Sequence, residues 1–234
     1  MTDLKMRGGT MTYTHLLFDL DGTITNPKLG ITNAVIYALA KYGITDQTND
    51  DLLTFIGPPL KDSFMNYFNF TKEEAVTAIE YFREYYRDKG LYENILYDGI
   101  GPLLKTLKDN GYTLAIATSK PTPFAKTILQ YFELDGYFEF IGGSKLDNTR
   151  TAKSEVIEHV LENLNIQDIS KVIMIGDREH DINGAKSHNM KSIGVLYGFG
   201  SREEFEKSGA DIIVESVAAL EQVLLQYCLN KTSK

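Results

Sequence analysis

Near its N-terminal end the chain contains the run His15-Leu16-Leu17-Phe18-Asp19-Leu20-Asp21-Gly22-Thr23. An apolar run that ends at a glycine turn predicts a buried strand. Two carboxylates at the end of such a strand are costly, because like charges so close together cannot both ionise unaided. A divalent cation would stabilise them, and hard oxygen ligands suit Mg²⁺. Because Asp-Gly alone is also an ordinary turn signal, the choice depends on the rest of the chain.

A length of 234 residues favours one large globular domain, or a domain with an insert. Lys and Arg number 24 against 32 Asp and Glu, a net charge of −8, so nonspecific nucleic-acid binding is not expected. The single cysteine, Cys228, excludes an internal disulfide and fits a reducing compartment. No apolar run reaches membrane-spanning length, and residues 1–10 lack the apolar segment of a signal peptide. We therefore expect a cytoplasmic protein with a flexible leader at residues 1–10 and no membrane partner.

Two different hydrophobic patterns follow the first strand. Apolar spacing predicts a series of helices with no strand among them from residue 26 to about residue 90, and strands alternate with helices from residue 97 onward. Thr71 with Glu74, and Ser201 with Glu204, predict capping boxes. The predicted helices span 30–42, 60–68, 72–89, 100–110, 123–132, 154–164, 182–188 and 217–229, and the later strands span 113–118, 138–141, 171–177, 192–196 and 211–214.

This alternation predicts the architecture. Strands that alternate with helices pair in parallel through right-handed crossovers. We expect an α/β fold, a doubly wound, Rossmann-like parallel sheet built from residues 11–25 and 93–234. An all-helical domain, residues 26–92, would be inserted after the first strand. Ligands of such sheets bind beyond the carboxyl ends of the strands, which makes the polar residues there the candidate site.

Polar residues gather at these predicted strand ends. Asp19 and Asp21 follow the first strand, Thr118-Ser119-Lys120 follow the second, and Gly176-Asp177 precede Asp181. Lys153 begins a helix, where a cation is unfavourable unless an anion binds as well. Each feature alone has an ordinary explanation as a turn, a helix cap or a solvated lysine. Their convergence on one edge of one sheet is the stronger signal.

With these motifs in this order, the sequence resembles the haloacid dehalogenase superfamily of phosphohydrolases. The first family motif is matched by Asp19-Leu20-Asp21-Gly22-Thr23, the second by Thr118, the third by Lys153, and the fourth by Gly176-Asp177 with Asp181. The position of the helical insert resembles the branch with an α-helical cap that contains phosphoglycolate phosphatase-like enzymes. Some members of that branch act on nucleoside monophosphates.

The resemblance implies a phosphatase mechanism. Asp19 would attack phosphorus and form an aspartyl-phosphate. Asp21 would protonate the leaving oxygen and then take a proton from the hydrolytic water. Mg²⁺ would be held by Asp19, the main-chain carbonyl of Asp21, and Asp177, while Asp181 would hold a metal-bound water or position Lys153. The presence of Asp21 favours phosphoryl transfer over dehalogenation.

The same resemblance implies the phosphate site. Thr118 and Lys153 would hold the equatorial oxygens of the phosphoryl group, whose charge needs stabilisation during transfer. The amides near Leu20 and Ser119 are candidate donors, and Gly22 would let the backbone approach the phosphate closely. The expected partner is a small phosphorylated metabolite, phosphoglycolate or a nucleoside 5′-monophosphate. The protein would be a monomer or a homodimer.

The cap would close over the site and select the substrate. Its hinges are expected near residues 25–28 and 92–98. The loop Ile56-Gly57-Pro58-Pro59-Leu60-Lys61 either faces the substrate or is a rigid helix connector. The aromatic residues at 64, 67, 68 and 70 are expected to form the core of the cap.

Other functions remain open on the same fold. A phosphonatase would use a cap lysine, for which Lys61 is the candidate, to form a Schiff base. A sugar phosphomutase would keep the same core but need a cap that shields the aspartyl-phosphate. A non-catalytic regulatory protein that binds a phosphate ligand should have lost one of the motif residues, whereas Asp19, Asp21, Lys153 and Asp177 are all present.

Overall fold

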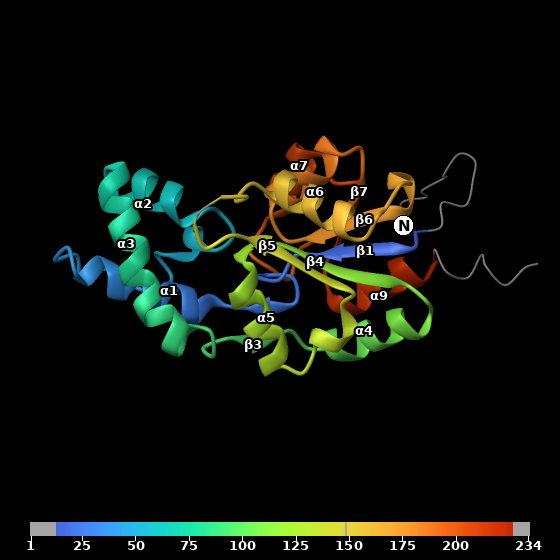
Figure 1. Ribbon diagram of the computed structural model, residues 1–234, viewed down its shortest axis with the longest axis horizontal. Coiled ribbons are helices and arrows are strands. Elements are labelled where there is room, and N and C mark those ends of the chain that lie inside the picture. Colours follow the sequence, from blue (N-terminus) through green and yellow to red (C-terminus); the bar gives the residue numbers. More distant parts are fainter. Residues whose placement is uncertain (1–12, 148, 227–234) are drawn as a thin grey trace, which may run out of the picture.

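The structure is a computed structural model that describes residues 13–147 and 149–226. Within these residues, six strands form one parallel sheet in the order β5-β4-β1-β6-β7-β8 (Figure 1). The strands are β1 (His15–Phe18), β4 (Thr113–Pro121), β5 (Phe140–Ser144), β6 (Val172–Gly176), β7 (Lys191–Val195) and β8 (Ile212–Val214). This confirms the predicted doubly wound α/β sheet. The predicted leader at residues 1–10 and Cys228 lie outside the described residues.

The strand order places a switch point at β1. The chain adds β4 and β5 on one side of β1, then returns to add β6, β7 and β8 on the other. Phe18 is in register with Ile116 of β4 and with Ile175 of β6. The residues that follow these strands therefore emerge together at one edge of the sheet, where the crossovers diverge and leave room for a ligand.

Helices cover both faces of the sheet. Leu16 and Phe18 belong to the larger apolar core, and Leu17 belongs to a second core on the opposite face, as the alternation of side chains along a strand requires. In Figure 1, α6 and α7 lie on one face, and α4, α5 and α9 lie on the other. The helices of this part are α4 (Ile100–Asp109), α5 (Thr122–Tyr131), α6 (Lys153–Asn163), α7 (Glu179–Ser187), α8 (Arg202–Ser208) and α9 (Val217–Gln226).

The helical segment, residues 26–92, lies at the end of the molecule beyond the carboxyl ends of β1 and β4 (Figure 1). It contains α1 (Lys28–Ala40), the 3₁₀ turn η1 (Leu53–Phe55), α2 (Leu60–Phe68), α3 (Lys72–Tyr85) and the π-helical turn η2 (Tyr86–Gly90). The expectation that no strand occurs from residue 26 to about residue 90 is wrong at its first residue, because β2 (Thr25–Asn26) pairs antiparallel with β3 (Ile95–Leu96). Two paired residues per strand are too few to give a period in the sequence.

The two predicted capping boxes have different outcomes. Thr71 Oγ1 accepts from the Glu74 amide at 3.2 Å, and the Thr71 amide donates to the Glu74 carboxylate at 2.8 Å, so the first box is confirmed. Ser201 Oγ accepts from the Glu204 amide at 3.1 Å. The Glu204 carboxylate, however, accepts from Arg178 Nε at 3.0 Å instead of completing the second box. A tertiary ion pair there outweighs the local cap.

Among the helices of residues 13–147 and 149–226, none combines the length and the apolar character that a membrane span requires.

Candidate active site

Three buried acids meet at the carboxyl edge of the sheet. Asp19 directly follows β1, Asp177 directly follows β6, and Asp181 lies in the first turn of α7. Because β1 and β6 are neighbours in register, the first two acids are brought together, and α7 adds the third. One oxygen from each carboxylate lies within 4.8 Å of those of the other two. The structure therefore assembles three of the predicted metal ligands.

Lys153, the first residue of α6, joins these acids. Its Nζ lies 3.0 Å from Asp19 Oδ2 and 2.7 Å from Asp181 Oδ1, and it donates to the Ala117 carbonyl at 3.0 Å. Burial by itself would lower the pKa of this ammonium, but Asp181 and Asp19 together raise the pKa above its usual value. Lys153 is therefore a buried cation paired with two carboxylates, and it also donates a hydrogen bond to one carbonyl.

Asp21 has a different environment from the other three acids. Its Oδ2 lies 2.9 Å from the Nζ of Lys120 on β4. Its Oδ1 is buried and has no hydrogen-bond partner in the part of the chain that the structure describes. Burial raises the pKa of Asp21, and Lys120 acts against that rise. The carboxylate is thus paired with a lysine outside the acid cluster, which leaves the main-chain carbonyl as the part of Asp21 suited to a metal.

The acid cluster fits a hard divalent cation. Four carboxylates lie beside two ammonium groups, Lys120 and Lys153, which leaves an excess of two negative charges. Asp177 Oδ1 is buried without a hydrogen-bond partner among the described residues. Burial, followed by the charges of Asp181 and Asp19, raises the pKa of Asp177 well above its usual range. An all-oxygen donor set with this charge is what Mg²⁺ prefers.

The residues predicted to bind phosphate line the same edge. Leu20 donates its amide to Asp19 Oδ1 at 2.7 Å, and Thr118 is buried on β4. Ser119 lines the cavity described below. Gly22 has a φ of +79°, and a Cβ there would lie 2.0 Å from Asp177 Oδ2. A glycine is therefore needed at position 22 to leave room for the Asp177 carboxylate. The close approach of Gly22 to phosphate stays a prediction.

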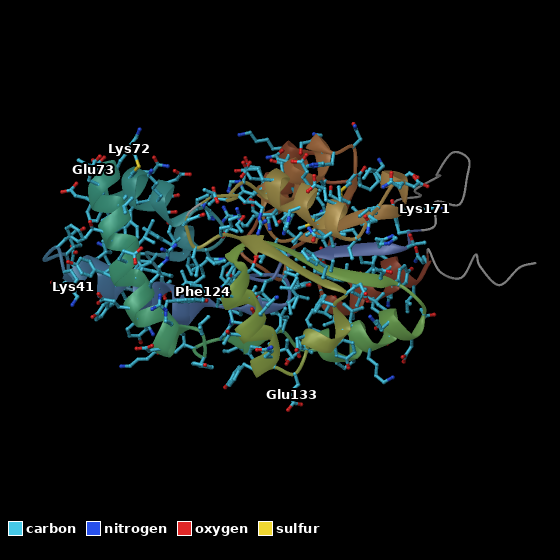
Figure 2. All side chains as sticks on the ribbon, in the orientation of Figure 1. Lys41, Lys72, Glu73, Phe124, Glu133 and Lys171 are labelled. Atoms are coloured by element: carbon cyan, nitrogen blue, oxygen red, sulfur yellow. The ribbon has the colours of Figure 1, made fainter. Side chains whose placement is uncertain are left out.

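A cavity of about 180 Å³ lies between the strand ends and the helical segment. The sheet side contributes Asp19, Asp21 and residues 118–121, and the loop at residues 57–61 contributes part of the other wall. The apolar part of the wall consists of Ile31, Phe55, Ile79, Phe82, Tyr86 and Phe124. Figure 2 places Phe124 at the junction of the two parts. The loop thus faces the same space as Asp19.

The aromatic residues at 64–70 are placed mostly as expected. Phe64 is fully buried, stacks on Phe70 at 5.8 Å between ring centroids, and meets Phe55 edge-on at 5.1 Å. Phe68 also packs against these rings, whereas Tyr67 is 52% exposed. Apart from Phe55, these side chains are absent from the cavity wall, which supports a packing role for them.

Sequence reasoning missed Lys120 and Tyr86, which line the cavity, and Arg178, which contacts the helical segment. The sequence marks Lys120 only as a neighbour of Thr118, although a cation at a strand end is a usable signal for a binding site. Tyr86 hydrogen-bonds to Lys120, and Arg178 Nη1 donates to the Ile56 carbonyl at 2.8 Å. Both contacts join residues that are distant in the chain, so no local spacing in the sequence predicts them.

The chain has a doubly wound sheet, a helical segment after the first strand, and acids beside a buried lysine at the switch point. This combination is the arrangement of a hydrolase of the haloacid dehalogenase class. Residues 16–195 match the family model described as haloacid dehalogenase-like hydrolase, and the chain belongs to that family. The predicted family is therefore confirmed.

Known proteins of this kind include phosphatases. The chain is 45% identical to a 5′-nucleotidase from Pseudomonas aeruginosa over 94% of its own length and 99% of that protein. It is 34% identical to the tyrosine-protein kinase PtkA of Mycobacterium tuberculosis, over 86% of this chain and 68% of that one. A crystal structure described as a predicted phosphatase from Clostridium acetobutylicum is 50% identical, with a TM-score of 0.89 over 92% of this chain and 99% of that one. The prediction of a phosphatase is thereby confirmed.

Proposed function

We propose that the protein is a Mg²⁺-dependent phosphomonoester hydrolase that acts on nucleoside 5′-monophosphates through an aspartyl-phosphate on Asp19. The observation that carries this proposal is the meeting of Asp19, Asp21 and Lys120 with an aromatic wall around one cavity. The sheet supplies the reacting groups, and the helical segment supplies a surface for the organic part of the ester. We further propose that the helical segment acts as the cap.

The first chemical step needs a free and oriented carboxylate. The Leu20 amide and the Lys153 ammonium hold the two oxygens of Asp19 in place. One oxygen forms a bond to phosphorus as the bond between phosphorus and the ester oxygen breaks. The leaving oxygen takes its proton from Asp21, a carboxyl whose pKa burial raises above its usual value.

The second step regenerates the enzyme. Water attacks phosphorus, the bond to the Asp19 oxygen breaks, and Asp21 takes a proton from the attacking water. Thr118 and Lys153 are assigned to the oxygens of the phosphoryl group. The ion pair between Asp181 and Lys153 favours a positioning role for Asp181.

Bound Mg²⁺ would be held by Asp19, Asp177 and the main-chain carbonyl of Asp21, with Asp181 near it, and would offset the charge of the acids and the phosphate dianion. Gly22 and the amide of Phe199 hold Asp177 in position for this role, because Phe199 donates to Asp177 Oδ2 at 2.9 Å. The second oxygen of Asp177 is then left for the cation.

The cavity wall favours a nucleotide over phosphoglycolate. Phe55, Phe82, Tyr86 and Phe124 offer apolar ring surface of the kind that packs against a nucleobase. Phosphoglycolate has no apolar group to cover these rings, and its carboxylate would depend on Lys61, Arg83 or Lys145 of the same wall. The relative described as a 5′-nucleotidase agrees with this preference.

A phosphatase panel tests this proposal directly. The purified protein should hydrolyse nucleoside 5′-monophosphates faster than phosphoglycolate and sugar phosphates, in the presence of Mg²⁺ and not in EDTA. Activity that EDTA does not change would overturn the metal dependence, and a preference for phosphoglycolate would overturn the substrate assignment. Failure to hydrolyse any ester would favour the non-catalytic binding protein. Trapping by borohydride with a phosphonoaldehyde would favour a phosphonatase that uses Lys61, a residue of the same cavity.

A further inference from the structure

Lys120 connects the sheet with the helical segment. It lies on β4, and its side chain is almost completely buried. The ammonium lies 2.9 Å from Asp21 Oδ2 and also donates to the hydroxyl of Tyr86. It lies 4.7 Å from the centroid of the Tyr86 ring as well, at cation–π distance. One buried cation thus contacts the proposed proton donor on one side and a residue of the helical segment on the other.

The backbone at Lys120 departs from regular pairing. The register of β4 against β5 shifts between Thr118 and Pro121, the interval that contains Lys120. Such irregularities redirect side chains and recur beside active sites. The shift accompanies a side chain that points into the space shared by the two parts of the molecule, where it lines the cavity.

The position of Tyr86 is fixed by its place in the backbone and by ring packing. It begins the π-helical turn η2, a rare element that recurs at functional sites. Its ring stacks on Phe82 at 5.0 Å and packs against Phe124 at 5.7 Å. Gly90 leaves room for that ring, because a Cβ at Gly90 would lie 2.6 Å from Tyr86 Cδ2. The hydroxyl therefore reaches Lys120 only while the helical segment is packed on the sheet.

We propose that Lys120 and Tyr86 form a positioning pair, which orients the Asp21 carboxyl for proton transfer only when the helical segment is docked. The pair would link closure over the substrate to protonation of the leaving oxygen. When the segment moves away, Lys120 loses the hydroxyl and the ring that fix its flexible stem, and Asp21 loses its fixed partner. This inference rests on the proposed function, since it assigns Asp21 to the leaving group.

The dependence on the leaving group separates positioning from simple stabilisation. A nucleoside 5′-monophosphate expels an alkoxide and needs a proton at the leaving oxygen, whereas 4-nitrophenyl phosphate expels a stable phenolate and needs little help. Lys120→Met and Tyr86→Phe should therefore lower kcat/KM for the nucleotide, which reports the steps through loss of the leaving group, by about 10-fold or more, within the range that general-acid catalysis supplies. kcat/KM for the nitrophenyl ester should change by less than about 3-fold, whereas kcat also contains the hydrolysis of the aspartyl-phosphate, which the two esters share. The effect of Tyr86→Phe should be the smaller of the two.

Matched controls remove an equivalent group elsewhere. Tyr85→Phe deletes the neighbouring hydroxyl, which donates to Glu93 at 2.8 Å, and Lys126→Met deletes an exposed ammonium on α5. Both should behave like the wild type with both esters. Circular dichroism of every variant confirms folding, and Tyr86→Phe keeps the ring packing should Lys120→Met fail to fold.

The outcomes are distinct. A selective loss with the nucleotide supports the positioning pair. Equal losses with both esters, or no loss for either variant, would overturn it. Wild-type protein that hydrolyses neither ester in Mg²⁺ would overturn the proposed function, and this inference with it.

Discussion

Lys153 is the residue on which the charge balance of the site depends most. Its ammonium meets two carboxylates and one carbonyl, all in a buried setting. A buried ion network of this kind is costly to break, because the remaining charges keep their desolvation penalty. The sheet supplies the carbonyl of Ala117 and the carboxylate of Asp19, so the lysine also fastens α6 to the strand ends.

Lys153→Met tests this account at the residue scale. Methionine fills nearly the same volume without the charge, so Asp19 and Asp181 lose their shared cation. We expect the free energy of unfolding in EDTA to fall by about 3 kcal/mol, as measured by urea denaturation. Lys126→Met, an exposed change on α5, should shift the same quantity by less than about 0.5 kcal/mol. Equal stabilities of the two variants would show that the network contributes little.

At the scale of elements, two glycines allow α1 to pack against η2. A Cβ on Gly30 would lie 2.1 Å from the carbonyl oxygen of Gly90, and one on Gly90 would lie 2.9 Å from the carbonyl oxygen of Gly30. The Gly30 amide donates to the Glu93 carbonyl at 3.0 Å in the same region. This close approach fixes the turn that carries Tyr86.

Gly30→Ala should force α1 and η2 apart. Overpacking of backbone against backbone typically costs about 1–3 kcal/mol, and we expect a loss of that size in the free energy of unfolding. Gly101→Ala is the matched control, because that glycine also lies in a helix and a Cβ there meets nothing within 4 Å. Alanine at position 101 should leave stability unchanged or raise it slightly, given its higher helix propensity. Chemical denaturation of both variants decides the matter; a Gly30→Ala protein as stable as the control would contradict this packing account.

The sequence predicts elements well where a period or a local motif exists. The capping box at Thr71 and the helix from Leu60 to Phe68 both follow from spacing over a few residues. The pairing of β2 with β3 has only two residues on each strand and leaves no such period. Glu204 shows the opposite case, in which a local motif is present but Arg178, 26 residues away, takes its carboxylate.

The candidate site likewise contains residues that the sequence predicts and contacts that it does not predict. Asp19, Asp177 and Lys153 were predictable, because each follows or begins an element at the edge where ligands bind. The contact between Tyr86 and Lys120 spans 34 residues, and the one between Ile56 and Arg178 spans 122. Such contacts depend on how the helical segment docks on the sheet, which no spacing within either part encodes.

At the scale of the whole molecule, the chain crosses between its two parts at the short β2–β3 ribbon (Figure 1). The predicted hinges at residues 25–28 and 92–98 contain these strands, and their motion stays a prediction. Arg178 and Lys120 contact the helical segment from the sheet side, one at the loop that follows η1 and one at η2. Docking of the segment thus encloses the cavity and completes the surroundings of Asp21 at the same time.

The central claim is that Asp19 becomes covalently phosphorylated during turnover. Its most direct test is acid quenching of the enzyme within milliseconds of mixing with Mg²⁺ and a nucleoside 5′-monophosphate labelled in its phosphate, followed by peptide mapping. We predict a hydroxylamine-sensitive label on the peptide that contains Asp19, with neither label nor turnover in a folded Asp19→Asn variant. A label on another residue, or an Asp19→Asn protein with near wild-type activity, would contradict the account.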